Sequence, residues 1–377
     1  MKYIKTAIAM SAIAGSAAWS GVSFAANNGI DGAHAVFVMT NNADSNQVIA
    51  FQRGPNGALG NPHSYGTDGR GSGGTVDPLA SQGSLTLSTD GAWLFAVNAG
   101  SGSVSVFRVN GAQLALTDRV ATEGSEPNSV AQFGSLVYVL NTAGSSSVVG
   151  FNFNNGKLIR IPNSLRFLSG NAVASGSVAF SPDGQFLIVT EKATNNLDVF
   201  KVLSDGSLSQ ATITKSAGPG AFSAGFARNG VAVVSETGTS APNSSAISSY
   251  VVQSNGTLAP ISSSVPTLGS ANCWNVVTPD GRFVYVSNAG SASVSGFAIG
   301  SGGTLTPLPG TVLALNPTGS ANIDITVSAD GKFLYTLNAG SGAVGMFAIQ
   351  PTNGTLTDLG TIGGLSAAAG HNGIAAN

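Results

Sequence analysis

The chain has 377 residues, and only 8% of them are charged, against roughly 25% in average proteins. Lys and Arg number 15 and Asp and Glu number 17, so the formal net charge of −2 offers no basic surface for nucleic acid or for an anionic membrane. The single cysteine, Cys273, excludes an intramolecular disulfide.

The first 25 residues have the features of a secretory signal peptide. Lys2 and Lys5 give a positive start, and Thr6–Ala18 is apolar but too short to span a membrane with ease. Ser23-Phe24-Ala25 then matches a small-x-Ala cleavage site. We therefore expect cleavage after Ala25 and a mature protein in the periplasm or outside the cell. The alternative is an uncleaved N-terminal anchor, and no later stretch is apolar enough for a membrane span.

One sequence unit recurs at a spacing of roughly fifty residues along the rest of the chain. Its clearest copy contains a turn, Asp330-Gly331, then the apolar run Phe333–Leu337, a loop of small residues and a second apolar run. This pattern predicts two antiparallel strands. The seven copies are Asp31–Phe51, Ser88–Phe107, Gly134–Phe151, Ser181–Phe200, Asn229–Tyr250, Thr278–Phe297 and Ser328–Phe347.

Each unit continues into a second turn and a further strand that begins with Leu. The second turns are Asn56-Gly57, Asn110-Gly111, Asn155-Gly156, Asp205-Gly206, Asn255-Gly256, Gly302-Gly303 and Asn353-Gly354. Asn-Gly and Asp-Gly pairs supply the positive φ that a tight hairpin needs. An inner strand, two middle strands and an outer strand in each unit predict an all-β, seven-bladed β-propeller with four-stranded blades. We expect residues 26–377 to form this single domain.

The two ends of the chain complement each other. Residues His371–Asn377 resemble an inner strand that stops before its Asp-Gly turn, whereas Asp31-Gly32 supplies such a turn ahead of the strand Ala35–Thr40. We therefore expect the N- and C-terminal strands to share one blade, which closes the ring without a free sheet edge.

Candidate functional residues lie where inner strands begin and where the next strands end, because both positions should meet around the mouth of the channel. The strand-end positions are Thr40, Asn98, Asn141, Glu191, Glu236, Asn288 and Asn338. The strand-start positions include Gln82, Asn128, Asn272, Trp274, Asn322, Asp324 and His371. The asparagines have an ordinary explanation, because Asn caps loop amides and tolerates left-handed backbone geometry. Trp274 could form the floor of a ligand site or could fill the core.

The carboxylates in these positions are more informative. The chain has only four Glu, and Glu191 and Glu236 occupy equivalent positions in adjacent blades. A carboxylate in a channel mouth can act as a general acid or base, although a structural role bonded to an amide or to Lys192 is the alternative. Asp324 and His371 are predicted neighbours, and a His–Asp contact could orient a proton carrier, whereas His371 could also serve only as a cap.

We expect no cofactor, because the chain shows neither a metal-ligand spacing nor a phosphate-binding or dinucleotide-binding motif. The oxygens of Glu191, Glu236 and Asp324 are nevertheless of the type that a divalent cation binds.

The pattern SPDG or TPDG, strand, NAGS, strand, NGxL resembles the seven-bladed lactonase family. That family includes bacterial propeller-type 6-phosphogluconolactonase and fungal carboxy-cis,cis-muconate lactonizing enzyme. The segments Ser81–Leu85, Thr190–Thr194 and Cys273-Trp274 resemble secreted bacterial 3-carboxymuconate cyclase-like members. The resemblance implies a propeller fold and a lactone hydrolase or lactonizing isomerase.

The chain also departs from the family pattern. Family enzymes carry Gly-Pro-Arg-His where this chain has Gly218-Pro219-Gly220-Ala221, and Glu-Ile-His where it has Asn322-Ile323-Asp324. Their Asn-Arg-Gly loop is here Asn338-Ala339-Gly340, so only Glu236 matches the family's loop glutamate. Lactones that carry phosphate or several carboxylates need Arg, so a neutral or weakly polar lactone suits this chain better.

Two functions remain open from the sequence. In the first, Glu236 is the general base of a lactone hydrolase or isomerase, assisted by Glu191 or Asp324. Gln82, Asn128 and Asn272 would then donate hydrogen bonds to the oxyanion. In the second, a non-catalytic propeller binds a glycan, a peptide or a protein on its Asn/Ser-rich face. Carboxylates that converge on one pocket would support the first function, and carboxylates that point apart or are consumed by salt bridges would favour the second. We expect a monomer in either case.

Overall fold

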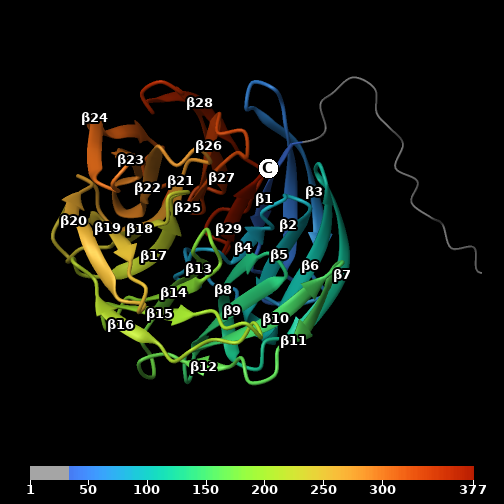
Figure 1. Ribbon diagram of the computed structural model, residues 1–377. Helices are drawn as coiled ribbons and strands as arrows, with labels where there is room; N and C mark the ends of the chain where they lie inside the picture. The colour runs from blue at the N-terminus through green and yellow to red at the C-terminus, as the bar shows by residue number, and fades with distance from the viewer. Residues whose placement is uncertain (1–33) are drawn as a thin grey trace, which may run out of the picture. The chain divides into compact units, whose positions relative to one another are not determined.

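Seven antiparallel sheets are arranged in a ring around a central axis, as the labelled strands in Figure 1 show. The structure is a computed structural model and describes residues 34–377. The predicted signal peptide and the Asp31-Gly32 turn lie outside the described residues. The prediction of an all-β, seven-bladed propeller is confirmed, because each sheet runs from an inner strand through two middle strands to an outer strand.

The blades follow the chain order. From inner to outer strand, the first three are β29 (Asn372–Ala376), β1 (Ala35–Met39), β2 (Gln47–Arg53), β3 (Leu59–Gly66); β4 (Leu85–Leu87), β5 (Trp93–Asn98), β6 (Ser103–Asn110), β7 (Gln113–Ala121); and β8 (Ser125–Phe133), β9 (Leu136–Ala143), β10 (Ser147–Asn154), β11 (Lys157–Arg160), with β12 (Arg166–Phe167) also paired to β10. The fourth and fifth are β13 (Ser175–Phe180), β14 (Phe186–Glu191), β15 (Asn196–Lys201), β16 (Thr212–Lys215); and β17 (Ala221–Phe226), β18 (Val231–Glu236), β19 (Ala246–Val252), β20 (Leu258–Pro266). The last two are β21 (Asn272–Val277), β22 (Phe283–Asn288), β23 (Ser293–Ile299), β24 (Leu305–Leu315); and β25 (Asn322–Val327), β26 (Phe333–Asn338), β27 (Ala343–Ile349), β28 (Leu356–Ile362).

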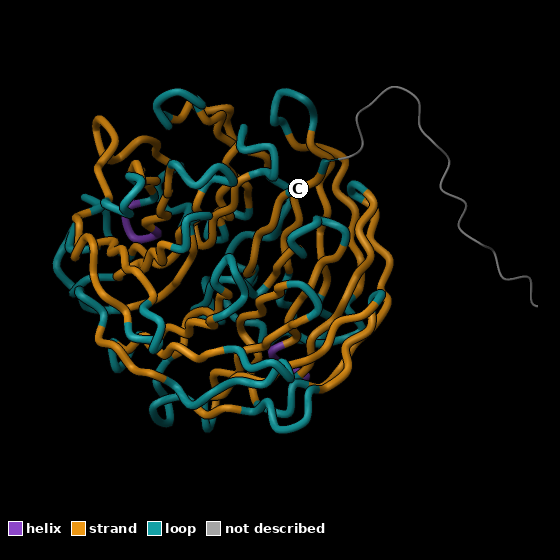
Figure 2. The backbone as a smooth tube through the Cα atoms, viewed as in Figure 1, coloured by secondary structure: helices purple, strands orange, loops and turns teal. Residues whose placement is uncertain are grey.

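The middle strands are buried on both faces because each blade is packed between two others. All six residues of β26 are buried, with the side chains of Phe333 and Tyr335 on one face and that of Leu334 on the other. Regular structure other than strand is limited, in the described residues, to two 3₁₀ turns at Ala99–Ser101 and Ala289–Ser291, which appear in purple in Figure 2. No helix within residues 34–377 has the length and apolarity needed to cross a membrane.

Two faces of the ring carry different connections. The loop face contains the connections that lead into the inner strands, such as 363–371, and those between the two middle strands, such as 339–342. The turn face contains the Asp-Gly turns between the inner strands and the next strands, such as the turn at Asp330-Gly331. Gly331 has a φ of +71°, which explains the requirement for glycine after the aspartate.

The ring is closed by the two ends of the chain. Strand β29 pairs antiparallel with β1, with Val36 opposite Ala376 and Val38 opposite Ile374. The prediction that both termini share one blade is therefore confirmed. The C-terminal segment thus supplies the inner strand of the blade that the N-terminal strands begin.

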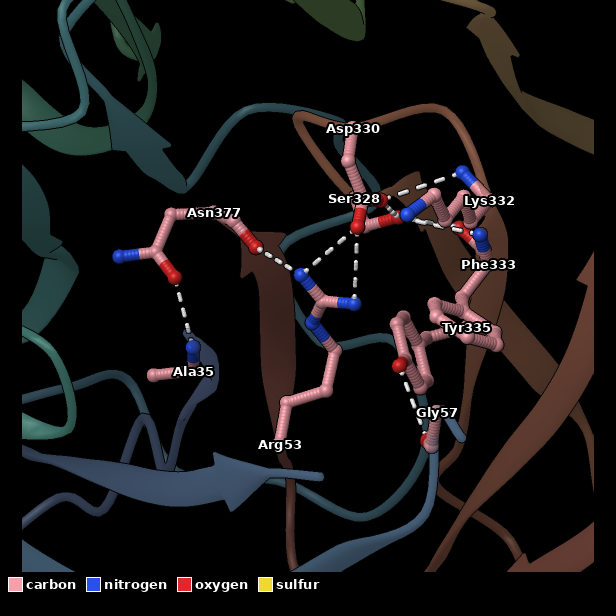
Figure 3. Close-up of polar contacts among 9 residues, drawn as sticks. All are labelled: Ala35, Arg53, Gly57, Ser328, Asp330, Lys332, Phe333, Tyr335 and Asn377. Atoms are coloured by element: carbon pink, nitrogen blue, oxygen red, sulfur yellow. Dashed lines mark hydrogen bonds and ion pairs between the residues drawn. The ribbon is translucent and has the colours of Figure 1, made fainter. Parts of the chain in front are cut away.

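A buried ion pair fastens this closing blade to the blade before it (Figure 3). Arg53, at the end of β2, is 2% exposed, and its Nη1 and Nη2 atoms each lie 3.2 Å from Oδ2 of Asp330. Nη2 also donates to the carbonyl of Asn377 at 3.4 Å, and the guanidinium lies 5.2 Å from the ring centre of Phe333. The side chain of Asn377 accepts a bond of 2.6 Å from the amide of Ala35. One arginine thus joins two blades and the C-terminus.

Candidate functional site

The segment Leu79–Gln82 crosses the central channel. The amide of Gln82 donates to the carbonyl of Gly176 in β13, at 2.9 Å. The Gln82 side chain pairs with the backbone of Asn275 in β21, donating at 2.7 Å and accepting at 3.2 Å. Since β4, β13 and β21 belong to three non-adjacent blades, the segment can reach both β13 and β21 only across the axis.

The residues predicted to bind substrate hold this segment and the blades in place. The indole nitrogen of Trp274 donates to the carbonyl of Ser81 at 2.8 Å, and Nδ2 of Asn128 donates to the carbonyl of Ser175 at 2.8 Å. Nδ2 of Asn272 donates to the carbonyl of Ala246 at 2.7 Å, in the preceding blade. Nδ2 of Asn322 donates to Oγ of Ser287 at 2.5 Å and to the carbonyl of Ser293 at 3.0 Å, also in the preceding blade. The expectation that Gln82 and these four residues ring an open mouth is therefore corrected: their donor groups are used within the protein.

Glu236 is also buried and fully bonded. Its Oε1 accepts hydrogen bonds from the amide of Gly218 at 2.7 Å and from the hydroxyls of Ser248 and Ser216 at 2.7 and 3.0 Å. Its Oε2 accepts a bond of 2.8 Å from the hydroxyl of Ser264. These partners come from the blade that contains Glu236 and from the loop that enters it. The side chain at the end of this middle strand therefore lies between the strands and the entering loop, and not in the channel.

Glu191, the equivalent residue one blade earlier, has a similar environment. Its oxygens accept bonds from the amide and hydroxyl of Ser169 at 2.9 and 2.5 Å, from the amide of Asn196 at 3.0 Å, and from the hydroxyl of Thr194. Burial raises the pKa of Glu191, but the bonds from Ser169 and Thr194 outweigh burial and hold it below its usual range. Glu191 and Glu236 have separate sets of donors in two blades, so the structure does not bring the two predicted carboxylates together.

The sequence analysis missed a second carboxyl group beside Glu191. Asp198 is buried on the neighbouring strand β15, and burial followed by the charge of Glu191 raises the pKa of Asp198. The raised pKa favours the protonated form of Asp198, and a protonated carboxyl can donate a hydrogen bond to Glu191. The equivalent positions in other blades hold Ser105, Ser248 and Ser295, whose hydroxyls also bond to the residue at the strand end or to a nearby carbonyl.

Replacement of Asp198 by Asn is expected to stabilise the protein progressively as pH rises. The pKa of Asp198 is about 8 in the folded protein against the ordinary 3.8, so the folded state binds the extra proton in this interval and wild-type stability falls toward high pH. The side-chain amide introduced by Asp198→Asn would donate to Glu191 without titrating. We expect the free energy of unfolding of the variant, minus that of the wild type, to increase by at most about 1.4 kcal/mol per pH unit between pH 5 and 8. Urea denaturation at each pH measures this difference. Asp205→Asn, in an exposed turn of the same blade, is the control and should give a constant difference, and a constant difference for Asp198→Asn would contradict the pairing.

Two further acidic residues lie close to the start of β29. Asp324 is buried, and its carboxyl oxygens accept bonds from the amides of Ile325 at 2.8 Å and Ile374 at 3.1 Å. Asp77, in the long loop before the channel-crossing segment, accepts a bond of 3.1 Å from Nδ2 of Asn372. Burial raises the pKa of each to about 7; Asn372 and Lys192 oppose this rise at Asp77. Asp324 bonds to the backbone of β29 and forms no hydrogen bond to His371, so the predicted His–Asp contact is absent from residues 34–377.

The groups of acidic residues do not form a metal site. Within residues 34–377, no three His, Cys, Asp or Glu side chains lie close enough together to hold a metal ion. Glu191 and Glu236 are bonded within two different blades, and Asp324 is bonded to β29 of the closing blade.

His371, another predicted catalytic residue, lines a cavity. It is 4% exposed and precedes β29, and neither ring nitrogen makes a hydrogen bond of acceptable geometry. Burial lowers the pKa of His371 below its usual 6.5, although the carbonyls of Met39 and Ser366 partly oppose this shift. Burial therefore favours the neutral imidazole, and its two ring nitrogens are enclosed beside these carbonyls.

The cavity beside His371 is a crevice on the loop face, which we call the His371 crevice. Its volume is about 360 Å³, and it lies between the connection from β1 to β2 and the connection from β28 to β29. Its polar lining comes from Thr40, Asn42, Ser45, Gln47, Ser366 and His371, and it contains no Lys, Arg, Asp or Glu. The crevice thus combines a neutral base with hydroxyl and amide donors.

Comparisons with known proteins were made for the sequence and for the structure. The model of the family described as lactonase, 7-bladed β-propeller, matches residues 34–175 and 275–365. No curated protein matches the chain.

Solved structures with low sequence identity share the fold. A periplasmic gluconolactonase of Pseudomonas aeruginosa has 20% identity and a TM-score of 0.66, with 89% of this chain and 97% of that chain covered. A candidate 6-phosphogluconolactonase of Bacteroides fragilis has 19% identity and a TM-score of 0.63, with 92% and 98% covered. A protein of unknown function from Desulfotomaculum acetoxidans has 16% identity and a TM-score of 0.64, with 90% and 98% covered.

Proposed function

Because this chain belongs to the seven-bladed β-propeller lactonase family, we propose that it hydrolyses a small lactone in the His371 crevice. The observation that carries this proposal is the side chain of His371, which lines the crevice and whose burial favours the neutral imidazole. Both carboxylate oxygens of Glu236 accept internal hydrogen bonds, so a base other than Glu236 suits the structure better.

In the proposed reaction, one ring nitrogen of His371 accepts a proton from a water molecule as its oxygen attacks the lactone carbonyl carbon. The new C–O bond forms, and the carbonyl oxygen becomes an oxyanion that the amide groups of Gln47 and Asn42 and the hydroxyl of Ser45 can stabilise by donation. The ring C–O bond then breaks, and the imidazolium returns its proton to the leaving alkoxide. The product is the open-chain hydroxy acid.

The crevice favours an uncharged lactone. Its lining contains no Lys or Arg, so a phosphate or a carboxylate on the substrate would lose water without gaining a cationic partner. We therefore propose a neutral polyhydroxylated lactone such as δ-gluconolactone as the substrate class. A substrate of that kind would fit with the name of the similar periplasmic enzyme of Pseudomonas aeruginosa.

His371→Gln is expected to lower kcat/KM for δ-gluconolactone by roughly 10²–10³-fold, because a positioned general base contributes about that much. The wild-type profile should rise through one ionisation below pH 6.5 and stay level above it, and this ionisation should vanish in the variant. His63→Gln, at an exposed position in β3, is the matched control and should retain wild-type activity. Full activity in a folded His371→Gln protein would refute the proposed role.

A binding function is the second candidate, favoured by the complete internal bonding of Glu191 and Glu236. On that alternative, the Asn/Ser-rich loop face recognises a glycan, a peptide or a protein, and no lactone is turned over. If the protein hydrolyses neither neutral nor acidic lactones, the binding function is the better explanation.

Export is part of the proposal. It is supported by the features of residues 1–25, which resemble a signal peptide, and by the periplasmic naming of one similar structure. Sequencing the N-terminus of the protein from the cell envelope or the medium tests cleavage after Ala25.

A further inference from the structure

A second cavity lies on the turn face, on the opposite side of the ring from the His371 crevice. Its volume is about 400 Å³, and it is formed where the turns of three consecutive blades meet. Arg228 comes from the turn after β17, Asp280 and Arg282 from the turn after β21, and Asp330 and Lys332 from the turn after β25. Three of the 15 Lys and Arg residues of a charge-poor chain therefore surround one hollow.

The two carboxylates of this hollow are already paired. Oδ2 of Asp280 lies 2.7 Å from Nε of Arg282, and Asp330 pairs with the buried Arg53 at 3.2 Å. Burial raises the pKa of each carboxyl, but the hydroxyl of Thr278 beside Asp280, the hydroxyl of Ser328 beside Asp330 and the paired arginines hold both below the usual range. Both stay ionised, and their charges are compensated within the protein.

Arg228 and Lys332 are not compensated. Neither has an ion-pair partner within residues 34–377, and both side chains are exposed at the hollow. They add two positive charges to a lining whose other charges are paired. A bound anion could approach both from the solvent side.

Part of the lining is apolar. Phe283 and Ile349 are largely buried beneath the hollow, and Pro279 and Pro351 form part of its wall. The guanidinium of Arg282 lies 5.1 Å from the centre of the Phe283 ring and also donates to the carbonyl of Pro351, so its position is held from two sides. An apolar floor beneath two free cations is complementary to an anion that has an apolar body.

We propose that this hollow binds a small organic carboxylate, with its carboxylate between Arg228 and Lys332 and its apolar body on Phe283 and Ile349. Arg is suited to the planar carboxylate, and the apolar floor favours an aromatic or branched aliphatic body over inorganic phosphate. The hollow lies on the opposite face from the His371 crevice, so carboxylate binding there can be tested independently of lactone hydrolysis.

Calorimetric titration of the full mature chain with benzoate tests the proposal. We expect saturable one-to-one binding that weakens about tenfold or more in the double variant Arg228→Gln/Lys332→Gln and weakens with added salt. Lys201→Gln, which removes an exposed cation at the end of β15, should leave the affinity unchanged. Benzyl alcohol, which has the same ring without the charge, should bind at least about tenfold more weakly than benzoate.

Three results would overturn the proposal: no saturable benzoate binding to the wild type, equal binding by the folded double variant, or tighter binding of inorganic phosphate than of benzoate. Both substituted residues are exposed, so circular dichroism and the thermal midpoint should show that the variants retain the fold.

Discussion

Glu236→Leu is expected to lower the free energy of unfolding by roughly 4 kcal/mol or more, whereas Glu236→Gln should cost only about 1 kcal/mol. Leucine would leave three buried donors, including the amide of Gly218, and the half-buried hydroxyl of Ser264 without an acceptor. Glutamine can keep the three bonds at Oε1, and its new amide can donate to the hydroxyl of Ser264 in place of Oε2. The remaining loss reflects weaker bonds to a neutral acceptor than to a charged one.

Chemical denaturation of the two variants measures this difference. Equal stability of the Glu236→Leu and Glu236→Gln proteins would contradict the view that Glu236 is an acceptor for four internal donors. Because Glu236→Gln should remain folded, it also distinguishes a structural role of Glu236 from a catalytic role. We expect this variant to keep lactone hydrolysis within a few-fold of the wild type, since the group that reacts lies elsewhere.

Asp330→Asn is expected to lower the free energy of unfolding by about 2–3 kcal/mol, because it leaves the buried guanidinium of Arg53 without its carboxylate. Asp330 is 26% exposed, so water moderates a loss that would be larger for a fully buried pair. The contact joins the closing blade to its neighbour (Figure 3). We therefore expect the weakened protein to open first at this joint, with faster amide exchange in β29 and β1 than in the other inner and middle strands.

The repeat supplies a matched control. Asp183 occupies the same turn in an earlier blade, where it accepts a bond of 2.5 Å from Ser181 as Asp330 does from Ser328 at 2.6 Å, but it has no ion pair in the described residues. Asp183→Asn should therefore lower the free energy of unfolding only by the amount that comes from the turn hydrogen bonds, without an ion pair. Adding Arg53→Met to Asp330→Asn should recover part of the loss, because it removes the unpaired cation while methionine still packs on Phe333. Equal costs for Asp330→Asn and Asp183→Asn would show that the ion pair contributes nothing to closure.

The fold could be predicted because it depends on local signals that recur. An Asp-Gly turn such as Asp330-Gly331 needs only a side chain that accepts local bonds and a glycine with positive φ, and both can be recognised in one repeat. Ring closure also followed from the sequence, because residues 371–377 lacked the partner strand that residues 35–40 could supply.

The candidate site was less accessible to the same reasoning. The repeat placed Glu236 at the end of a strand correctly, but not the direction of its side chain, which depends on the loop holding Gly218 and Ser216. Asp77 lies in a long connection outside the repeat, so no periodic pattern gave its position, and the repeat placed Gln82 at a strand start without indicating that its segment crosses the channel. Asp198 could have been noticed in the sequence, because a carboxylate occupies a position where equivalent strands have serine. His371 was identified from its strand-start position, whereas its crevice comes from loops of two blades.

The most direct measurement is kcat/KM for δ-gluconolactone with the wild type, His371→Gln and Glu236→Gln assayed side by side after each is shown to be folded. If the His371 crevice is the site of hydrolysis, His371→Gln loses roughly 10²–10³-fold and Glu236→Gln changes only a few-fold. The reverse order, with Glu236→Gln inactive and His371→Gln close to the wild type, would contradict this assignment and return the reaction to the buried carboxylate.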